Sequence, residues 1–470
     1  RPRTHRCGGR DLLTLIEQAA SSLSRPQAWC GTRRVFLTIW CVLALVKLAL
    51  ALALPLFGDE AFYWLEGQYP AWSYSDLPPV TAWLAAIGSV AIPGEFGVRA
   101  IFLALGLAVP WQLIAMTRRW YGDDVAWRAG VLAMLIPLAS ILGVLALPDV
   151  PLAAVSLLAV DALALALRRG AWRDWLAFGA AMAMGLLVHY RFLILVAMIG
   201  GVLIAHPSGR RALRACKLWV AVAVAALGLV PLLVFNLEHD LAGLRFQLVD
   251  RHPWAWQSDG WLQLVEQALV ASPVVFGLFG WTVWRTFRQR PVFWPEDVVV
   301  PMAAGVWLAF FVLGFFADNE RFRWHWSLPA YLLLVPALAA RWPQLKRWIA
   351  SLAMAVAASI SLLALSYFAA AAMPERGWLA GKQFPANFAG WREAALWMDG
   401  VPSASKERWV VDNFMLAAAL RFYRDTPCDA SILVLNDTLN IRHGRAAQLS
   451  IWGIDEAALA ADPKPSGWLI

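Results

Sequence analysis

The sequence predicts an all-α protein that crosses a membrane many times, followed by a small C-terminal α/β domain. Apolar residues make up 60% of the 470 residues and charged residues only 15%, a composition outside the range of soluble globular proteins. Long apolar runs alternate with short basic clusters, and after Pro374 these runs shorten and charge returns. We therefore expect a basic N-terminal segment at 1–34, a transmembrane domain at 35–372 and an outer domain at 373–470.

The N-terminal segment sets the predicted orientation. Asp11–Ser24 has the amphipathic pattern of a helix on a membrane surface, and an unstructured tail or expression remnant is the alternative. No cleavable signal precedes the first apolar run, so we interpret that run, Val35–Phe57, as a signal anchor. Arg33 and Arg34 come directly before it, and the positive-inside rule assigns them to the cytoplasm. The residues after Phe57 are then expected outside.

The later basic clusters continue this alternation and give eleven membrane segments, with the N-terminus inside and the C-terminus outside. Arginine or lysine residues follow every second run, as the positive-inside rule requires. The runs after the anchor are Val98–Met116, Val125–Leu147, Pro151–Leu167, Trp175–Ala205 as two segments, Trp219–Phe235, Leu264–Trp284, Val298–Ala317, Ser327–Ala340 and Ile349–Ala372.

The run Trp175–Ala205 is too long for one span, and the basic cluster that begins at Arg210 requires it to begin and end inside. Two short or broken helices that meet at His189, Tyr190 and Arg191 satisfy this requirement. A cation within an apolar run is costly and needs a partner, so Arg191 is a candidate functional residue. The alternative is an arginine that extends to the membrane interface.

The outer domain is expected to be a small α/β unit. Trp409–Asp412 and Ile432–Leu435 have the pattern of buried strands, and Phe414–Arg424 between them has the pattern of a helix. The five cysteines show neither a C-x-x-C pair nor zinc-ligand spacing, and we expect no disulfide in this domain.

The stretch GDEAFYWLEGQYPAWSYSDLPP at 58–79 is the first candidate for chemistry. Asp59 and Glu60 follow the anchor directly, where protein, headgroups and water meet and where a lipid-borne substrate can arrive. An aromatic run that includes Tyr63 follows, and a turn at Asp76 with two prolines returns the chain to an apolar helix. Ordinary solvated loop acids are the alternative.

This loop resembles the bacterial GT-C glycosyltransferases related to protein O-mannosyltransferases and the lipid A aminoarabinose transferase, through D-E-A-x-Y-W and Y-x-D-x-P-P. The resemblance implies a helical membrane protein of many spans whose donor is a sugar on a polyprenyl phosphate. It also implies that an acid of this loop lies in the active site. That role maps to Asp59, with Glu60 beside it, and Tyr63 and Asp76 become candidate substrate-loop residues.

The resemblance continues in two further elements. Asp149 lies in the P-D-x-P step that these enzymes often show, although capping of the next helix explains this acid without chemistry. Relatives commonly read G-L-x-x-x-S-K where this chain has GLLVHYR from Gly185. Arg191 therefore occupies the register of a lysine, while His189 and Tyr190 depart from the pattern. The charge is kept, but a planar guanidinium replaces a compact ammonium group.

Two later outer loops carry further candidates. NERFRWHW at 319–326 supplies Arg321, Arg323 and His325, which fit an anionic headgroup or simply a solvated interface. The ending H-W-x-x-P-A-Y also resembles the family. The loop 236–261 resembles it too and contains several candidates, among them Arg251 and His252.

Together these features predict an inverting GT-C glycosyltransferase of the bacterial inner membrane, with its active site facing the periplasm. It would move one sugar from a polyprenyl phosphate to a lipid, glycan or protein. Asp59 would act as general base or as electrostatic partner of the anomeric carbon, and arginines would hold the phosphate. Without a D-x-D motif we expect no metal requirement.

The partners expected are the lipid-linked donor, the bilayer and the acceptor, for a protein that is monomeric. The net charge of +8 is scattered between apolar runs and reflects topology, not nucleic-acid binding. A transporter or lipid-flipping protein is the main alternative, since buried charges and broken helices would also line a transport path. A receptor or assembly partner that binds through its outer domain is a third.

Overall fold

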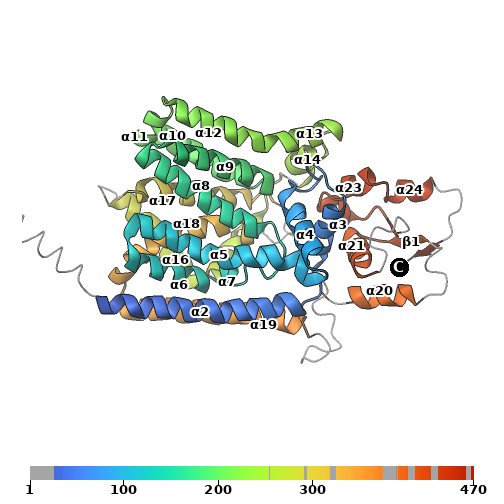
Figure 1. Cartoon of the computed structure of the whole chain (residues 1–470), viewed down its shortest axis with the longest axis horizontal. Coiled ribbons are helices and arrows are strands. Elements are labelled where there is room, and N and C mark those ends of the chain that lie inside the picture. Colours follow the sequence, from blue (N-terminus) through green and yellow to red (C-terminus); the bar gives the residue numbers. More distant parts are fainter. Residues whose placement is uncertain are drawn as a thin grey trace, which may run out of the picture.

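A computed structural model of the chain describes residues 26–252, 254–289, 294–317, 324–373, 388, 390–400, 408–424, 432–461 and 467–469 (Figure 1). Helices dominate, and the long ones lie side by side along the long axis of the molecule. The elements before residue 374 are α2 (Pro26–Ala53), α3 (Gly58–Gln68), α4 (Val80–Ala91), α5 (Glu95–Tyr121), α6 (Asp123–Leu135), α7 (Pro137–Ser140), α8 (Asp149–Arg169), α9 (Trp172–Val188), α10 (Phe192–Ala205), α11 (Pro207–Ala212), α12 (Cys216–Ala226), η1 (Leu227–Leu229), α13 (Val230–Glu238), α14 (Ala242–Arg245), η2 (Phe246–Asp250), η3 (Ser258–Leu262), α15 (Gln263–Ala271), α16 (Pro273–Arg288), α17 (Glu296–Leu313), η4 (Trp324–Ser327), α18 (Leu328–Arg341), η5 (Trp342–Gln344) and α19 (Arg347–Ala371).

Six helices in the described part of the chain are long and apolar enough to cross a membrane, which makes this a multi-pass membrane protein. A seventh crossing is available if the bent pair Ser258–Ala271 and Pro273–Arg288 forms one broken span. The six are Gly31–Ala53, Glu95–Tyr121, Asp149–Arg169, Cys216–Glu238, Glu296–Leu313 and Arg347–Ala371.

Two predicted single spans are broken in the structure. In the predicted run Val125–Leu147 the long helix ends at Leu135, because Pro137 cannot continue its hydrogen bonds. Only the four-residue helix α7 follows, and the chain beyond it forms turns. The run Leu264–Trp284 bends by 104° between α15 and α16, where Pro273 begins the second helix. In both runs the hydropathy pattern predicts one continuous helix, whereas the structure has a break in the helical backbone.

The predicted break in Trp175–Ala205 is present. Helix α9 ends at Val188 and α10 begins at Phe192, with His189, Tyr190 and Arg191 between them. The backbone of His189 is extended, with φ of −162° and ψ of 140°, so the two helices do not form one rod. The junction frees polar side chains for contacts that a continuous apolar helix would lack.

The C-terminal elements form a three-stranded parallel sheet with helices around it. The strand order is β2-β1-β3, and Trp409 pairs with Ile432 on one side and with Trp468 on the other. The strands and intervening helix lie close to the predicted positions. The elements are α20 (Trp391–Asp399), β1 (Arg408–Val411), α21 (Phe414–Tyr423), β2 (Ile432–Val434), α22 (Thr438–Arg442), α23 (Ala446–Ile451), α24 (Glu456–Ala460) and β3 (Gly467–Leu469).

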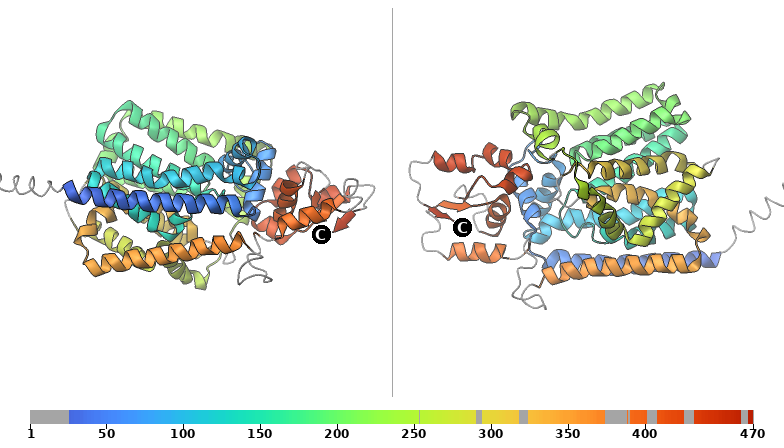
Figure 2. Two further views of the ribbon diagram at one scale, coloured as in Figure 1. Left: turned by 60° about the horizontal axis from the view of Figure 1, so that its bottom comes forward. Right: turned by 180° about the vertical axis from the view of Figure 1, so that it is seen from behind.

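The short helices α3 and α4 lie at one end of the helical bundle, next to the C-terminal elements (Figures 1 and 2). The arginine-rich helix α11 lies at the opposite end. Helices α5 and α8 also carry two arginines each in their last turns, which agrees with the alternation expected from the positive-inside rule. The predicted candidate loop is thus enclosed between the bundle and the C-terminal elements.

Candidate active site

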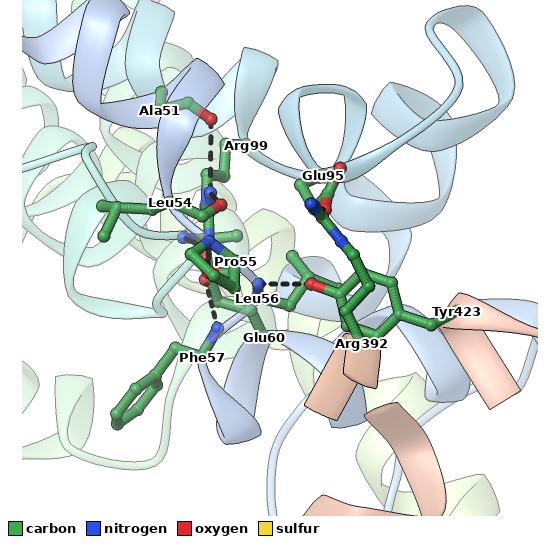
Figure 3. A network of polar contacts seen from close by, with 11 residues as sticks. Ala51, Leu54, Pro55, Leu56, Phe57, Glu60, Glu95, Arg99, Arg392 and Tyr423 are labelled. Carbon is green, nitrogen blue, oxygen red and sulfur yellow. Dashed lines mark hydrogen bonds and ion pairs between the residues drawn. The ribbon is translucent and has the colours of Figure 1, made fainter. Parts of the chain in front are cut away.

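The adjacent acids of α3 have different environments. The Glu60 side chain is fully buried and pairs with Arg99 (Figure 3). Its Oε1 accepts hydrogen bonds from Nε of Arg99 at 2.8 Å and the backbone N–H of Ala146 at 2.7 Å. Its Oε2 accepts from Nη2 of Arg99 at 2.6 Å and the backbone N–H of Phe57 at 2.9 Å. With both oxygens occupied and the side chain 0% exposed, this geometry argues against the catalytic role suggested for Glu60.

Arg99 extends this contact to the end of α2. Its Nη1 donates to the carbonyl oxygen of Leu54 at 2.6 Å, and its Nη2 donates to that of Pro55 at 2.7 Å (Figure 3). The last carbonyl groups of a helix have no partners within the helix, so a buried arginine is well suited to satisfy them. The pair of Glu60 and Arg99 therefore fixes the position of α3 relative to α2 and α5.

Asp59 points instead toward the C-terminal elements. Its Oδ1 accepts a hydrogen bond from Nη1 of Arg445 at 2.6 Å, and the Asp59 side chain is 24% exposed. Arg445 directly precedes α23 and also donates from Nε to Oδ2 of Asp76 at 3.1 Å. One guanidinium thus joins two of the acids in the segment 58–79 to a segment near the C-terminus.

Aromatic rings surround the guanidinium of Arg445. Its Cζ lies 4.0 Å from the ring centroid of Phe414, 4.4 Å from that of Phe62 and 5.3 Å from that of Tyr63. Cations are attracted to the faces of such rings, and the weak hydration of a guanidinium makes its burial tolerable. Tyr63, a predicted substrate-loop residue, is buried here and serves as a wall of the Arg445 site.

The ionisation of Asp59 follows from these contacts. Burial raises the pKa of Asp59, but the charge of Arg445, together with His443, the Arg445 hydrogen bond and His325, outweighs burial and leaves the pKa below its ordinary value. Asp59 is therefore a carboxylate at neutral pH. Its low basicity makes it a weak proton acceptor and a strong source of negative charge.

Asp76 is buried and held on several sides. Its backbone carbonyl accepts from Nε2 of Gln247 at 2.6 Å. The neighbouring Ser75 donates from its backbone N–H to Oε1 of Gln448 at 2.9 Å and from its hydroxyl to the carbonyl oxygen of Gly444 at 2.5 Å. The turn predicted to return the chain to the bundle therefore also docks against the C-terminal segment.

A second polar cluster joins α8 to the break between α9 and α10. Asp149, the first residue of α8, accepts from Nη2 of Arg191 at 3.1 Å. Nε of Arg191 lies 3.0 Å from Nε2 of His189, a contact that requires a neutral histidine. The remaining Nη1 of Arg191 is buried and has no hydrogen-bond partner within the described residues.

His325 connects the two clusters electrostatically. Its Nε2 lies 3.9 Å from Oδ2 of Asp149. Burial lowers the pKa of His325 to about 4; the carboxylates of Asp149 and Asp59 raise it, while Arg191 and Arg251 lower it further. His325 is therefore neutral at pH 7, and the two acids and two arginines that act on it occupy a common region.

The loop after α13 borders the same region. Arg251 donates from Nη1 to Oε1 of Gln247 at 2.6 Å, and Gln247 contacts Asp76 as described above. His252 is buried against Trp254 and Trp326, so it packs within an aromatic cluster. Tyr190 lies near Asp76.

The structure brings together most of the predicted site residues. These are Asp59, Tyr63, Asp76, Asp149, His189, Tyr190, Arg191, Arg251, His252 and His325. Arg321 and Arg323 lie outside the described residues. No group of three or more His, Cys, Asp or Glu side chains suited to a metal ion occurs in the part of the chain that was described.

Sequence reasoning missed Glu66, Arg99 and Arg445. Glu66 was detectable, because positions 59, 63 and 66 share one face of a helix and this places Glu66 beside Asp59 and Tyr63. Arg445 lies in a segment, IRHGRAAQLSIWG, whose position in space no local pattern specifies.

Comparison with known proteins places these observations in a family context. Residues 76–235 match the model of the dolichyl-phosphate-mannose-protein mannosyltransferase family. The lipid A galacturonosyltransferase RgtD of Rhizobium johnstonii is 28% identical over 313 residues, which cover 61% of this chain and 62% of that relative's length.

The fold is that of a known crystal structure. ArnT from Cupriavidus metallidurans superposes with a TM-score of 0.62 in the apo state, at 14% identity over 88% of both chains. Its structure bound to undecaprenyl phosphate gives a TM-score of 0.65, at 17% identity over 91% of this chain and 90% of that one. The resemblance to GT-C membrane glycosyltransferases is thus confirmed, and a transporter is not favoured.

Proposed function

We propose that this protein is a glycosyltransferase that moves a single sugar from a polyprenyl phosphate to an acceptor at the outer face of the bacterial inner membrane. The observation that carries the proposal is the position of His325, which lies 3.9 Å from Asp149 of the Arg191 ion pair and is within electrostatic reach of Asp59. A partly exposed carboxylate and a buried guanidinium with an unbonded Nη1 thus share one region. Sugar transfer needs such a pair, an anion near the anomeric carbon and a cation at the leaving phosphate.

The proposed reaction is a single displacement with inversion. An acceptor oxygen forms a bond to the anomeric carbon while the bond from that carbon to the phosphate oxygen breaks. The electron pair of the broken bond stays on the phosphate, which leaves as a lipid monophosphate. Arg191 holds this growing negative charge, and Asp149 and His189 orient Arg191. Arg251 borders the same region and adds positive charge.

Asp59 acts in this scheme mainly through its charge. As the leaving group departs, positive charge develops at the anomeric carbon, and a fixed carboxylate stabilises it. The lowered pKa of Asp59 makes general-base catalysis less favourable. A phosphate acceptor is already ionised and needs no base, whereas a hydroxyl acceptor would pass its proton to Asp59 or to water.

We propose a lipid A-type glycolipid as the acceptor and a polyprenyl-phosphate uronic acid as a donor to test first. The support is the match to a lipid A galacturonosyltransferase. We further propose eleven membrane segments with the C-terminal α/β elements as a periplasmic domain, a monomeric enzyme and no divalent-metal requirement. The three parallel strands and the helices around them support the α/β assignment.

The test is a transfer assay with the purified protein. Polyprenyl-phosphate galacturonic acid and lipid A in detergent micelles should yield glycosylated lipid A and free polyprenyl phosphate in equal amounts, both measured by mass spectrometry. Arabinose-type and mannose donors serve as sugar controls. Donor movement across vesicles without release of polyprenyl phosphate would instead support the transporter alternative.

A further inference from the structure

Glu66 is a buried acid next to the proposed active site that the mechanism above does not use. It lies on α3 and is 1% exposed, and neither of its carboxyl oxygens accepts a hydrogen bond from a donor group among the described residues. Oδ1 of Asp76 is in the same situation, although its Oδ2 accepts from Arg445. An uncompensated buried carboxylate is costly, so this arrangement requires an explanation.

Tyr74, two residues before Asp76, donates its hydroxyl to the carbonyl oxygen of Glu66 at 2.7 Å, and Asp76 acts on the Glu66 carboxyl group through its charge and a hydrogen bond, so the two acids are neighbours. Two carboxylates in such a position repel, and the pair is relieved when one proton is shared between them. Burial raises the pKa of Glu66 well above its ordinary value, and the charge of Asp76 and a hydrogen bond to it raise it further, while Arg445 opposes both. Burial and Asp76 outweigh Arg445 and favour a neutral Glu66 at physiological pH.

We propose that Glu66 is a positioning residue that stays protonated and donates its proton to Oδ1 of Asp76, so that Oδ2 of Asp76 can hold Arg445 against Asp59. This inference rests on the proposed function in one respect: it takes Asp59 to be the carboxylate that stabilises the anomeric carbon. Glu66 itself lies behind Arg445 and touches the reaction only through it.

Charge balance explains why a neutral acid suits this position. Arg445 already pairs with Asp59 and Asp76. An ionised Glu66 would add a third anion, draw the guanidinium toward itself and weaken its hold on Asp59. Among the described residues, the other titratable groups near this cluster are Tyr63, Tyr74, Tyr190, His325 and His443. The Tyr74 hydroxyl donates to the Glu66 carbonyl oxygen at 2.7 Å, Tyr190 lies near Asp76, and the two histidines act on Asp59.

The first measurement needs no substrate. Infrared difference spectra between wild type and Glu66→Gln, recorded on the purified full chain at pH 7, should contain the carbonyl stretch of a protonated carboxyl group in the wild type alone. The matched control is Glu393→Gln, because Glu393 is exposed on α20 and should give only a carboxylate difference. A carboxylate signal for Glu66 at pH 7 would overturn the proposal, whatever the protein's activity.

The second measurement separates a neutral hydrogen-bond donor from a required negative charge. The amide introduced by Glu66→Gln would still donate to Asp76 and carries no charge, so this variant should keep kcat within a few-fold of wild type. Glu66→Leu fills the space without donating and should lower kcat at least ten-fold, with little change in KM for the donor. Equal losses in both variants would refute the role. An inactive wild type would count against the proposed function and leave the infrared result valid.

Discussion

Nη1 of Arg445 lies 2.6 Å from Oδ1 of Asp59, although the two residues are 386 positions apart in the chain. The candidate site is therefore built jointly by the segment 58–79 and a segment near the C-terminus. Because Arg445 is 2% exposed and enclosed by aromatic rings, this contact is a fixed part of the fold rather than a surface ion pair.

Replacement of the acting carboxylate should stop transfer without preventing donor binding. Asp59→Asn keeps the shape of the side chain and removes its charge, so kcat should fall by about a hundred-fold or more, while donor affinity changes by only a few-fold. Single-turnover kinetics and a donor-binding assay measure the two effects. Asp240→Asn is the control, since Asp240 is exposed and its φ of 51° is tolerated by asparagine. Normal turnover in Asp59→Asn would show that the active site does not include Asp59.

The pH dependence should reveal the pairing of Asp59 with Arg445. Activity needs the carboxylate, so it is present above the pKa of Asp59 and is lost as pH falls through that value. With Arg445 in place this pKa is lowered, and the acid limb of the wild type should lie below the ordinary range of an aspartate. Arg445→Met leaves the effect of burial, which raises the pKa, and should move the acid limb to higher pH; Arg445→Lys should move it less. If the folded variants and the wild type have the same acid limb in their pH–activity profiles, Arg445 does not set the pKa of Asp59.

Glu60 should behave as a stability residue. Removal of one partner from a buried ion pair typically costs about 3–5 kcal/mol, because the other charge is left uncompensated. Glu60→Gln should therefore lower the thermal midpoint clearly, and the effect should shrink when Arg99→Met is added. Thermal unfolding of the two single variants and the double variant gives the coupling energy. Additive losses would mean that the two side chains do not act as a pair.

Arg191 should matter for the phosphate. Arg191→Ala should weaken binding of polyprenyl phosphate and lower turnover at least ten-fold, while Arg191→Lys should keep part of both because charge remains and the bidentate geometry is lost. Arg245→Ala is the matched control, since Arg245 ends the short helix α14 and its side chain is 73% exposed. Binding isotherms with the lipid phosphate provide the measurement. If Arg191→Ala binds polyprenyl phosphate as well as the wild type does, Arg191 does not bind the phosphate and only extends to the membrane interface.

Metal dependence is a further direct test of the chemistry. We expect transfer to continue at the normal rate after dialysis against a chelator, because arginines can neutralise a monophosphate leaving group. The assay compares chelated enzyme before and after addition of Mg²⁺ or Mn²⁺. Loss of activity in chelator that either ion restores would refute the expectation.

The sequence by itself determined the membrane character, the break at His189–Arg191 and the segment 58–79 as a cluster of acids at the end of the first apolar run. These features follow from local rules: hydropathy over about twenty residues, the cost of a cation among apolar residues, and helix or strand periodicity. The strands at Trp409 and Ile432 were predictable for the same reason.

Only the tertiary structure decided which acid of the pair Asp59 and Glu60 is available for chemistry. Adjacent residues on a helix point about 100° apart, and the sequence does not state which acid faces the buried Arg99 of α5 and which stays partly exposed beside Arg445. The contacts of Glu60 with Ala146 and of Asp59 with Arg445 span 86 and 386 positions. Contacts over such separations depend on how the helices pack, and packing is a property of the whole chain rather than of any segment.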